Sequence, residues 1–261
     1  MIGKEEGRVR LGYDEAGEGR VLLLVHGFPI DRRIWAHQVA GLSNVRRVVA
    51  VDLRGRGKSP APAEGGWTID DHADDLAETL DALDVETADL GGISMGGYIA
   101  FAFYRRYPER VRSLILVSTR ATPDPPEYQT GRVTTAQRAR RYGTRALAGS
   151  MLPNLLAEEA PEPVQEQVLA MFDAVPGETS ATDSLAMKDR ADSTPMLASI
   201  AVPALVIEGA GEQLLPAGSA KALADAIPGS RLVSIPNAGH FAPVENPDAV
   251  NGAIRGFLDL R

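Results

Sequence analysis

The chain has 261 residues, of which 44% are hydrophobic and 24% are charged, and it contains no cysteine. A chain of this length can bury one large core, and the missing thiols exclude disulfides, cysteine nucleophiles and cysteine-ligated metals. The net charge of −8 argues against nucleic-acid binding, which depends on basic side chains that neutralise phosphates. Four histidines are available for imidazole chemistry, and no two have the spacing of a local metal motif: His26, His37, His72 and His240.

The predicted partners follow from the same composition. No stretch approaches the roughly 20 apolar residues needed to cross a bilayer, and residues 1–7 carry charges and glycine where a signal peptide has its apolar run. We therefore expect a cytoplasmic protein that binds neither membrane nor nucleic acid; its oligomeric state is left open. A local basic cluster is interpreted as a solvated helix face, and its members are Arg132, Arg138, Arg140, Arg141 and Arg145.

Short apolar runs alternate with longer amphipathic stretches along most of the chain. In chain order, strands are predicted at 8–11, 21–25, 48–51, 88–90, 114–117, 204–207 and 231–235, and helices at 70–83, 96–106 and 247–260. Several of these strands are rich in Val, Leu and Ile, which indicates burial on both faces. The pattern predicts an α/β fold with a mostly parallel central sheet flanked by helices.

Residues 121–195 interrupt this alternation. A proline-rich boundary at 122–126 is followed by apolar residues at helical spacing and by no convincing strand. The stretch is much longer than a crossover connection requires. We predict a helical lid at 121–195, inserted into a catalytic domain formed by 1–120 and 196–261, and expect part of its apolar face to line a substrate pocket.

Two glycine-containing sequences resemble nucleotide-binding motifs but lack the required spacing. Gly57-Lys58-Ser59 would need a glycine where Asp52 stands to form a P-loop. In Gly209-Ala210-Gly211, Leu214 occupies the third glycine position of a dinucleotide fingerprint. We expect no nucleotide, no metal and no other cofactor.

The sequence Gly92-Ile93-Ser94-Met95-Gly96 matches the G-x-S-x-G spacing and lies between a predicted strand and a predicted helix. A serine on so tight a turn needs strained backbone angles, and the flanking glycines allow the strand and helix to approach. The spacing alone is also compatible with a glycine-rich turn that carries an incidental serine. Its context favours Ser94 as a nucleophile.

A serine nucleophile needs a base and an orienting carboxylate. His240 follows the last predicted strand, whereas His37 and His72 lie in predicted surface helices and are interpreted as ordinary exposed or half-buried residues. We interpret His26 as shaping its loop. Glu208 is assigned to a strand edge and Glu212 to the loop after it, so the predicted chain order is Ser94, Glu212, His240.

Five sequences in this order resemble the α/β-hydrolase superfamily, and the chain is similar to small bacterial carboxylesterases and to 3-oxoadipate enol-lactonases. They are the segments 25–29, 52–59, 92–97, 190–194 and 237–240. The resemblance implies that Ser94 is the nucleophile, His240 the base, and the amides of Phe28 and Met95 the oxyanion hole. Relatives usually have aspartate where this chain has Glu212.

The expected activity is two-step acyl transfer on short-chain esters or lactones. A lactone hydrolase similar to 3-oxoadipate enol-lactonase is an alternative. A ligand-binding protein with feeble catalysis is another, because Glu212 replaces the usual aspartate. Perhydrolysis uses the same three residues, whereas dehalogenation would need a carboxylate at the position of Ser94.

Overall fold

The computed structural model describes residues 10–61 and 65–259. Within these residues, seven strands form one sheet in the order β1-β3-β2-β4-β5-β6-β7. Strand β1 pairs with β3 in antiparallel orientation, and all other neighbours are parallel. The strands are β1 Tyr13–Ala16, β2 Val21–Val25, β3 Arg47–Val51, β4 Ala88–Ile93, β5 Val111–Val117, β6 Ala204–Gly209 and β7 Arg231–Ile235.

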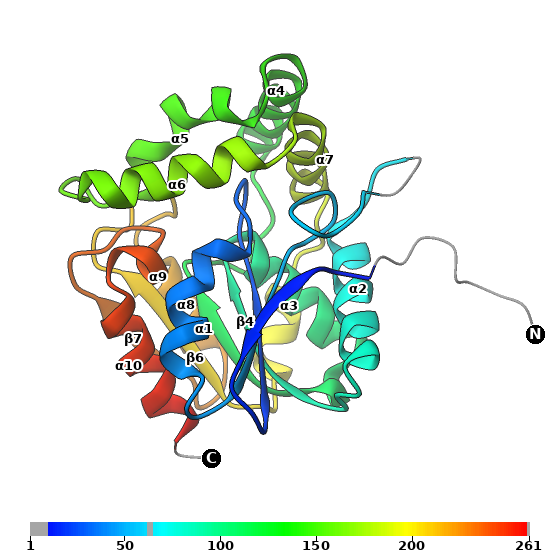
Figure 1. Cartoon of the computed structure of the whole chain (residues 1–261), viewed down its shortest axis with the longest axis vertical. Coiled ribbons are helices and arrows are strands. Elements are labelled where there is room, and N and C mark those ends of the chain that lie inside the picture. Colours follow the sequence, from blue (N-terminus) through cyan, green and yellow to red (C-terminus); the bar gives the residue numbers. More distant parts are fainter. Residues whose placement is uncertain (1–9, 62–64, 260–261) are drawn as a thin grey trace, which may run out of the picture.

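Helices cover both faces of the sheet. Figure 1 shows α1 and α10 on one side and α2 and α3 on the other, and each pair is in mutual contact. A capping box at Thr68 and Asp71 starts α2, and the Asn246 side chain caps α10. The helices around the sheet are α1 Ala36–Leu42, α2 Ile69–Ala82, α3 Met95–Arg106, α8 Ser219–Ala226, α9 Ala242–Glu245 and α10 Pro247–Leu258. None of the described helices has both the length and the apolar character needed to cross a membrane.

Four further α-helices follow β5 and precede β6 in the chain, and they lie at the top of Figure 1. Residues 121–195, all of which the structure describes, contain no strand, as predicted. Two short 3₁₀ helices accompany them: η3, Thr144–Leu147, follows α4, and η4, Thr194–Ser199, connects the end of this segment to β6. The α-helices are α4 Pro126–Tyr142, α5 Ala148–Leu155, α6 Glu162–Ala174 and α7 Gly177–Lys188.

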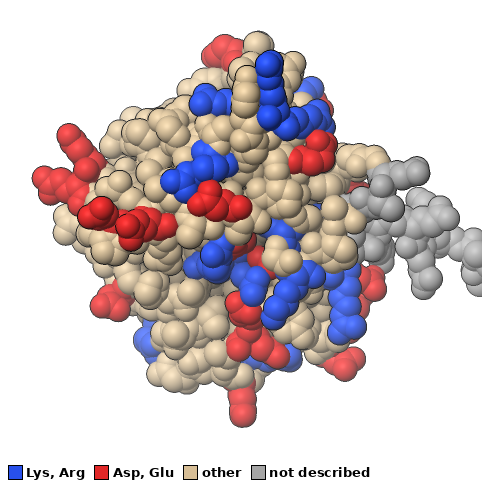
Figure 2. Space-filling view, turned by 45° about the horizontal axis from the view of Figure 1, so that its top comes forward, with Lys and Arg blue, Asp and Glu red and all other residues tan. Residues whose placement is uncertain are grey.

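The predicted basic cluster is only partly a solvated face. Figure 2 turns this helical segment forward and shows Lys and Arg side chains interspersed with Asp and Glu. Arg140 pairs with Glu178 and Arg145 with Asp173, all of them exposed at the surface. For Arg132 the prediction is wrong, because its Nε donates to the buried carboxylate of Asp124, 2.9 Å away.

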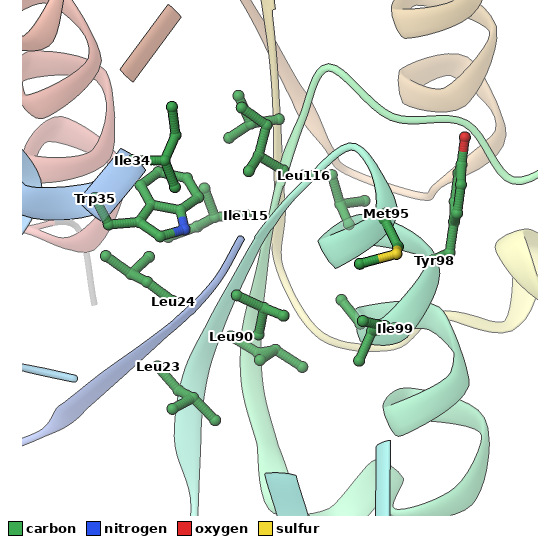
Figure 3. Packing of buried hydrophobic residues seen from close by; sticks show 14 of the residues in the cluster. Leu23, Leu24, Ile34, Trp35, Leu90, Met95, Tyr98, Ile99, Ile115 and Leu116 are labelled. Carbon is green, nitrogen blue, oxygen red and sulfur yellow. The ribbon is translucent and has the colours of Figure 1, made fainter. Parts of the chain in front are cut away.

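The core lies between the central strands and the helices. The strands β2, β4 and β5 are almost wholly buried, as expected for parallel strands covered on both faces. Figure 3 shows Leu24, Leu90 and Ile115 from these strands packed among Trp35 and Ile99, which come from η1 (Arg32–Trp35) and α3. This rigid packing supports the loops at the carboxyl ends of the strands.

The predicted strands are confirmed except the first. Residues 88–90 form a strand that continues through Gly91 and Gly92, where a Cβ on Gly91 would lie 2.7 Å from Leu24 Cδ2. Among the described residues the first strand is Tyr13–Ala16, and Arg10 and Leu11 of the predicted strand 8–11 lie in no strand. Within these residues β1 pairs with β3 alone, and this backbone pairing holds a largely polar sequence that carries no apolar signal. Residues 1–9 and 260–261, which enter the predictions for 1–7, 8–11 and 247–260, lie outside the described residues.

The interpretation of His72 as exposed or half-buried is wrong, because α7 covers the start of α2. His72 is fully buried, and its Nε2 lies 3.0 Å from Oδ1 of Asp183 on α7. Trp67 Nε1 donates to the same oxygen over 2.6 Å, and Arg56 pairs with the other carboxylate oxygen. This buried cluster joins the helical segment to the loops of the sheet domain.

We expect Asp183→Asn to lower the free energy of unfolding by about 3–5 kcal/mol, because it leaves the Arg56 charge buried and unpaired. Burial opposes ionisation of Asp183, but Arg56 and His72 outweigh it and hold the pKa of the carboxyl well below its ordinary value. This contribution to stability is therefore fully present above the ordinary pKa of aspartate and is lost as the pH falls through the folded-state pKa. Urea unfolding from neutral to acidic pH measures both effects.

The matched control is Asp173→Asn, which breaks the exposed pair with Arg145. Exposed pairs contribute about 0–1 kcal/mol, so this variant should unfold at nearly the wild-type urea concentration. Equal losses in the two variants would contradict the importance of the Asp183 cluster.

Candidate active site

Ser94 occupies a strained turn between β4 and α3. Its backbone angles are φ 54° and ψ −115°, in a region that side-chain-bearing residues rarely adopt. A Cβ on Gly92 would lie 2.2 Å from the carbonyl oxygen of Gly96, and one on Gly96 would lie 2.3 Å from that of Val25. Glycine is therefore required at both positions, as the sequence predicts, and the turn presents Ser94 at the carboxyl edge of the sheet.

The backbone around Ser94 is held by the neighbouring strand. The Ser94 N–H donates to the carbonyl oxygen of Val117 over 2.9 Å, and Thr119 Oγ1 donates to the carbonyl oxygen of Ser94 over 2.8 Å. The amides of Phe28 and Met95, the two predicted oxyanion donors, are paired with no other group in residues 10–61 and 65–259. They are consequently free to bind a ligand oxygen.

His26 organises the loop that carries Phe28. Its ring lies 2.8 Å from the Gly27 carbonyl oxygen through Nδ1, and its Nε2 accepts from the Leu53 amide over 3.0 Å. Burial, with a further contribution from the Arg56 charge, lowers the pKa of His26 to about 3. A neutral ring with Nδ1 protonated satisfies both contacts, which agrees with the interpretation of His26 as a loop-shaping residue.

Glu212 and His240 are brought together from the loops after β6 and β7. Glu212 Oε2 accepts from His240 Nδ1 over 2.8 Å, and Oε1 accepts from the amides of Leu214 and Leu215 over 2.8 and 3.2 Å. Burial opposes ionisation of Glu212, but these hydrogen bonds outweigh it and hold the pKa of the carboxyl below its ordinary value. Glu208 lies within β6, as predicted, and burial raises its pKa.

The second ring nitrogen of His240 is available for proton transfer. His240 Nε2 is buried and has no hydrogen-bond partner, Ser94 included, among the residues that the structure describes. The bond to Glu212 assigns the proton of a neutral ring to Nδ1 and leaves the lone pair on Nε2. A nitrogen in this state can act as a general base.

Glu245 is a site residue that the sequence did not indicate. Its carboxylate accepts from the amide of Gly239, next to His240, over 2.9 Å and from the amide of Ala157 over 2.6 Å. The Phe241 amide also donates to the Leu155 carbonyl oxygen over 3.0 Å. The end of α5 is thus bound directly to the loop that carries His240. The contacting residues are more than eighty positions apart in the sequence, so no local motif could have predicted the contact.

Ser94 lines a cavity of about 390 Å³ beneath the helical segment. Phe28 and Met151 contribute apolar surface, and Met151 lies on α5, so part of the segment lines the pocket as predicted. The other apolar and aromatic lining residues are Tyr98, Tyr128, Met187, Leu214 and Leu215, and the charged ones are Arg120, Glu127 and Arg132. In the described part of the chain no group of three His, Asp or Glu side chains could hold a metal ion.

The sheet topology, the elbow and the histidine–carboxylate pair define the α/β-hydrolase fold. The chain belongs to this family, whose model, described as the alpha/beta hydrolase fold, matches residues 20–247. The family match covers the strands and loops that carry Ser94, Glu212 and His240.

Relatives include esterases and an enol-lactonase. A thermophilic esterase from Thermogutta terrifontis, solved with malate bound, is 40% identical with a TM-score of 0.93, and the match covers 98% of this chain and 96% of that one. The enol-lactonase from Burkholderia xenovorans LB400 is 32% identical with a TM-score of 0.88, over 96% and 97% of the two chains. The AB hydrolase superfamily protein YisY of Bacillus subtilis is 32% identical over 97% of each chain.

Proposed function

We propose that this protein is a serine hydrolase that cleaves short-chain carboxylic esters or lactones through an acyl-enzyme on Ser94. The 2.8 Å bond between His240 Nδ1 and Glu212 Oε2 carries the proposal, because it leaves a basic Nε2 at the sheet edge where the elbow presents Ser94. Relatives named esterase and enol-lactonase support the same reaction class.

In the first step, His240 Nε2 takes the proton of Ser94 Oγ while the oxygen forms a bond to the ester carbonyl carbon. The amides of Phe28 and Met95 stabilise the oxyanion, with the N-terminal end of α3 adding its positive dipole. The bond from carbon to the alcohol oxygen then breaks, and the imidazolium gives its proton to the leaving alcohol. Water, deprotonated by the same nitrogen, then adds to the acyl carbon. The bond from that carbon to Ser94 Oγ breaks, the acid is released, and the imidazolium returns its proton to Oγ.

Glu212 suits the role of orienting acid although it is longer than the aspartate usual in relatives. The amides of Leu214 and Leu215 hold one carboxylate oxygen, so the extra methylene is accommodated by the loop and the other oxygen reaches His240. This geometry favours an active enzyme over a hydrolase-like binding protein.

The helical segment 121–195 is proposed to act as the lid of this site. Met151 on α5 and Met187 on α7 line the cavity with Ser94, and Glu245 binds the segment to the histidine loop. A cavity of about 390 Å³ suits a short acyl chain or a small lactone. Lactone hydrolysis is the second candidate, favoured by the 32% identity to the enol-lactonase over nearly the whole chain.

A chain-length series of p-nitrophenyl esters from acetate to decanoate, assayed beside one enol-lactone, tests the proposal. We expect kcat/KM within the ordinary enzyme range of about 10⁴–10⁸ M⁻¹s⁻¹ for acetate or butyrate, and a decline as the chain outgrows the cavity. Turnover of every ester and of the lactone no faster than in enzyme-free buffer would contradict the proposal and favour a binding protein.

A further inference from the structure

A buried carboxylate holds three arginines beside the proposed catalytic serine. Asp124 Oδ1 accepts from Arg120 and, over 2.8 Å, from Arg190, and Oδ2 accepts from Arg132 over 2.9 Å. Asp124 is almost fully buried. One carboxylate cannot neutralise three guanidinium groups, so this cluster carries excess positive charge.

Two of these arginines, Arg120 and Arg132, line the cavity together with Ser94. Arg120 directly follows Thr119, whose hydroxyl donates to the Ser94 carbonyl oxygen, so its backbone is tied to the elbow. The residue is only 9% exposed, and its Nε is buried without a hydrogen-bond partner among the described residues. Asp124 therefore does not use the full donor capacity of the Arg120 guanidinium.

The opposing charge at this end of the cavity is weaker. Glu127 also lines the cavity, but it is exposed at the start of α4 and is screened by water. Tyr128 lies with its ring centroid 5.7 Å from the Arg120 guanidinium carbon, and Tyr98 lies 4.2 Å from that of Arg190, which supports flat, preorganised guanidinium groups. The three guanidinium groups carry three positive charges and the carboxylates of Asp124 and Glu127 carry two negative ones, so the group has a net charge of +1.

We propose that Arg120, supported by Arg132, forms a carboxylate subsite, and that the preferred substrates are esters or lactones carrying a free carboxylate. This inference rests on the proposed function for its reaction and names the substrate class. A planar guanidinium matches a carboxylate in geometry, and its charge is worth more in a partly desolvated cavity than in water. The apolar residues that line the same cavity would hold a short carbon chain.

Binding tests the subsite without turnover. Isothermal titration of glutarate into the Ser94→Ala protein is expected to show affinity at least about tenfold higher than that of methyl pentanoate, which has no carboxylate, because glutarate gains a charge-assisted contact. Arg120→Gln should weaken glutarate binding by about 10- to 100-fold, and Arg120→Lys should restore part of it. Arg120→Gln is expected to fold, because Asp124 keeps its bonds to Arg132 and Arg190.

Arg138→Gln is the matched control, since Arg138 lies on α4 like Arg132, is exposed and does not line the cavity. It should bind glutarate as the parent does. Equal affinity for glutarate and methyl pentanoate, or equal loss in the Arg120 and Arg138 variants, would overturn the subsite. Inorganic phosphate that displaces glutarate with the same affinity would overturn its assignment to carboxylates.

Kinetics separates this inference from the proposed function. The wild-type protein should cleave monomethyl glutarate with higher kcat/KM than methyl pentanoate, and Arg120→Gln should lower the value for monomethyl glutarate about 10- to 100-fold more than the value for methyl pentanoate. Equal losses for both esters would assign Arg120 a structural role and overturn the subsite, while turnover of methyl pentanoate would leave the proposed function standing. Glutarate binding without cleavage of either ester would uphold the subsite and contradict the proposed function.

Discussion

Ser94→Ala is expected to lower kcat for ester hydrolysis by about 10⁶-fold, the loss typical of removing a serine nucleophile that acts with its base as a unit. The change removes only Oγ. The strained turn is held by Gly92, Gly96 and the bond from the Ser94 amide to Val117, none of which needs the hydroxyl. The residual rate of p-nitrophenyl butyrate hydrolysis and the thermal unfolding temperature measure activity and folding separately.

Ser199→Ala is the control for this experiment. Ser199 is exposed at the end of η4, its hydroxyl donates to the Met196 carbonyl oxygen, and it does not line the cavity. It should keep wild-type activity. An active and folded Ser94→Ala protein would refute the assignment of Ser94 as the nucleophile.

Glu212→Gln is expected to lower kcat by about 10⁴-fold, because an amide can donate to His240 Nδ1 and favour the wrong tautomer. The fold should survive, since the amides of Leu214 and Leu215 can still bond to the side-chain carbonyl oxygen. Although burial opposes ionisation of Glu212, its hydrogen bonds hold the pKa of the carboxyl below the ordinary value of glutamate, so the charge of the carboxylate persists down to pH values below that ordinary pKa. Measurement of kcat for the wild type and the variant at neutral pH checks the expected loss.

Glu212→Asp and Glu208→Gln distinguish a specific role from a general effect of charge. The aspartate is one methylene shorter, so it cannot keep both the Leu214 contact and the 2.8 Å bond to His240, and kcat should fall below the wild-type value. Glu208 lies four residues earlier in β6, and its loss should leave kcat nearly unchanged. A Glu212→Asp protein faster than the wild type would show that the loop is not adapted to glutamate.

The elbow was predictable because its chemistry is local. Glycine is required two positions before and after Ser94, because a Cβ on Gly92 would lie 2.2 Å from the Gly96 carbonyl oxygen within the turn and one on Gly96 would lie 2.3 Å from the Val25 carbonyl oxygen of β2. The sequence singled out His240 as the proposed base by elimination among four histidines and by its place after the last strand, and the structure pairs it with Glu212. Glu212 followed from chain order and from the end of β6.

Other features depended on contacts between distant segments. His72 is buried because α7 brings Asp183 over the start of α2, more than one hundred residues later in the chain. Arg132 was predicted to belong to a solvated basic cluster. In the structure its guanidinium group bonds to Asp124 and the residue lines the cavity, and neither contact can be deduced from the local sequence. The edge strand β1 is held by backbone pairing with β3, and its largely polar sequence has no apolar pattern from which a strand could be predicted.

The sequence by itself limited the chemistry that we propose: without cysteine and with four histidines, the chain offers a candidate serine nucleophile, one candidate base after the last strand and a candidate acid in the expected order. The local periodicities also determined the α/β alternation, because strand and helix patterns arise from near neighbours. Tertiary structure alone decided which charged side chains are desolvated and what lines the cavity with Ser94. Burial and long-range pairing are properties of the packed chain, so the excess charge at Arg120 becomes visible only when the helices lie over the sheet.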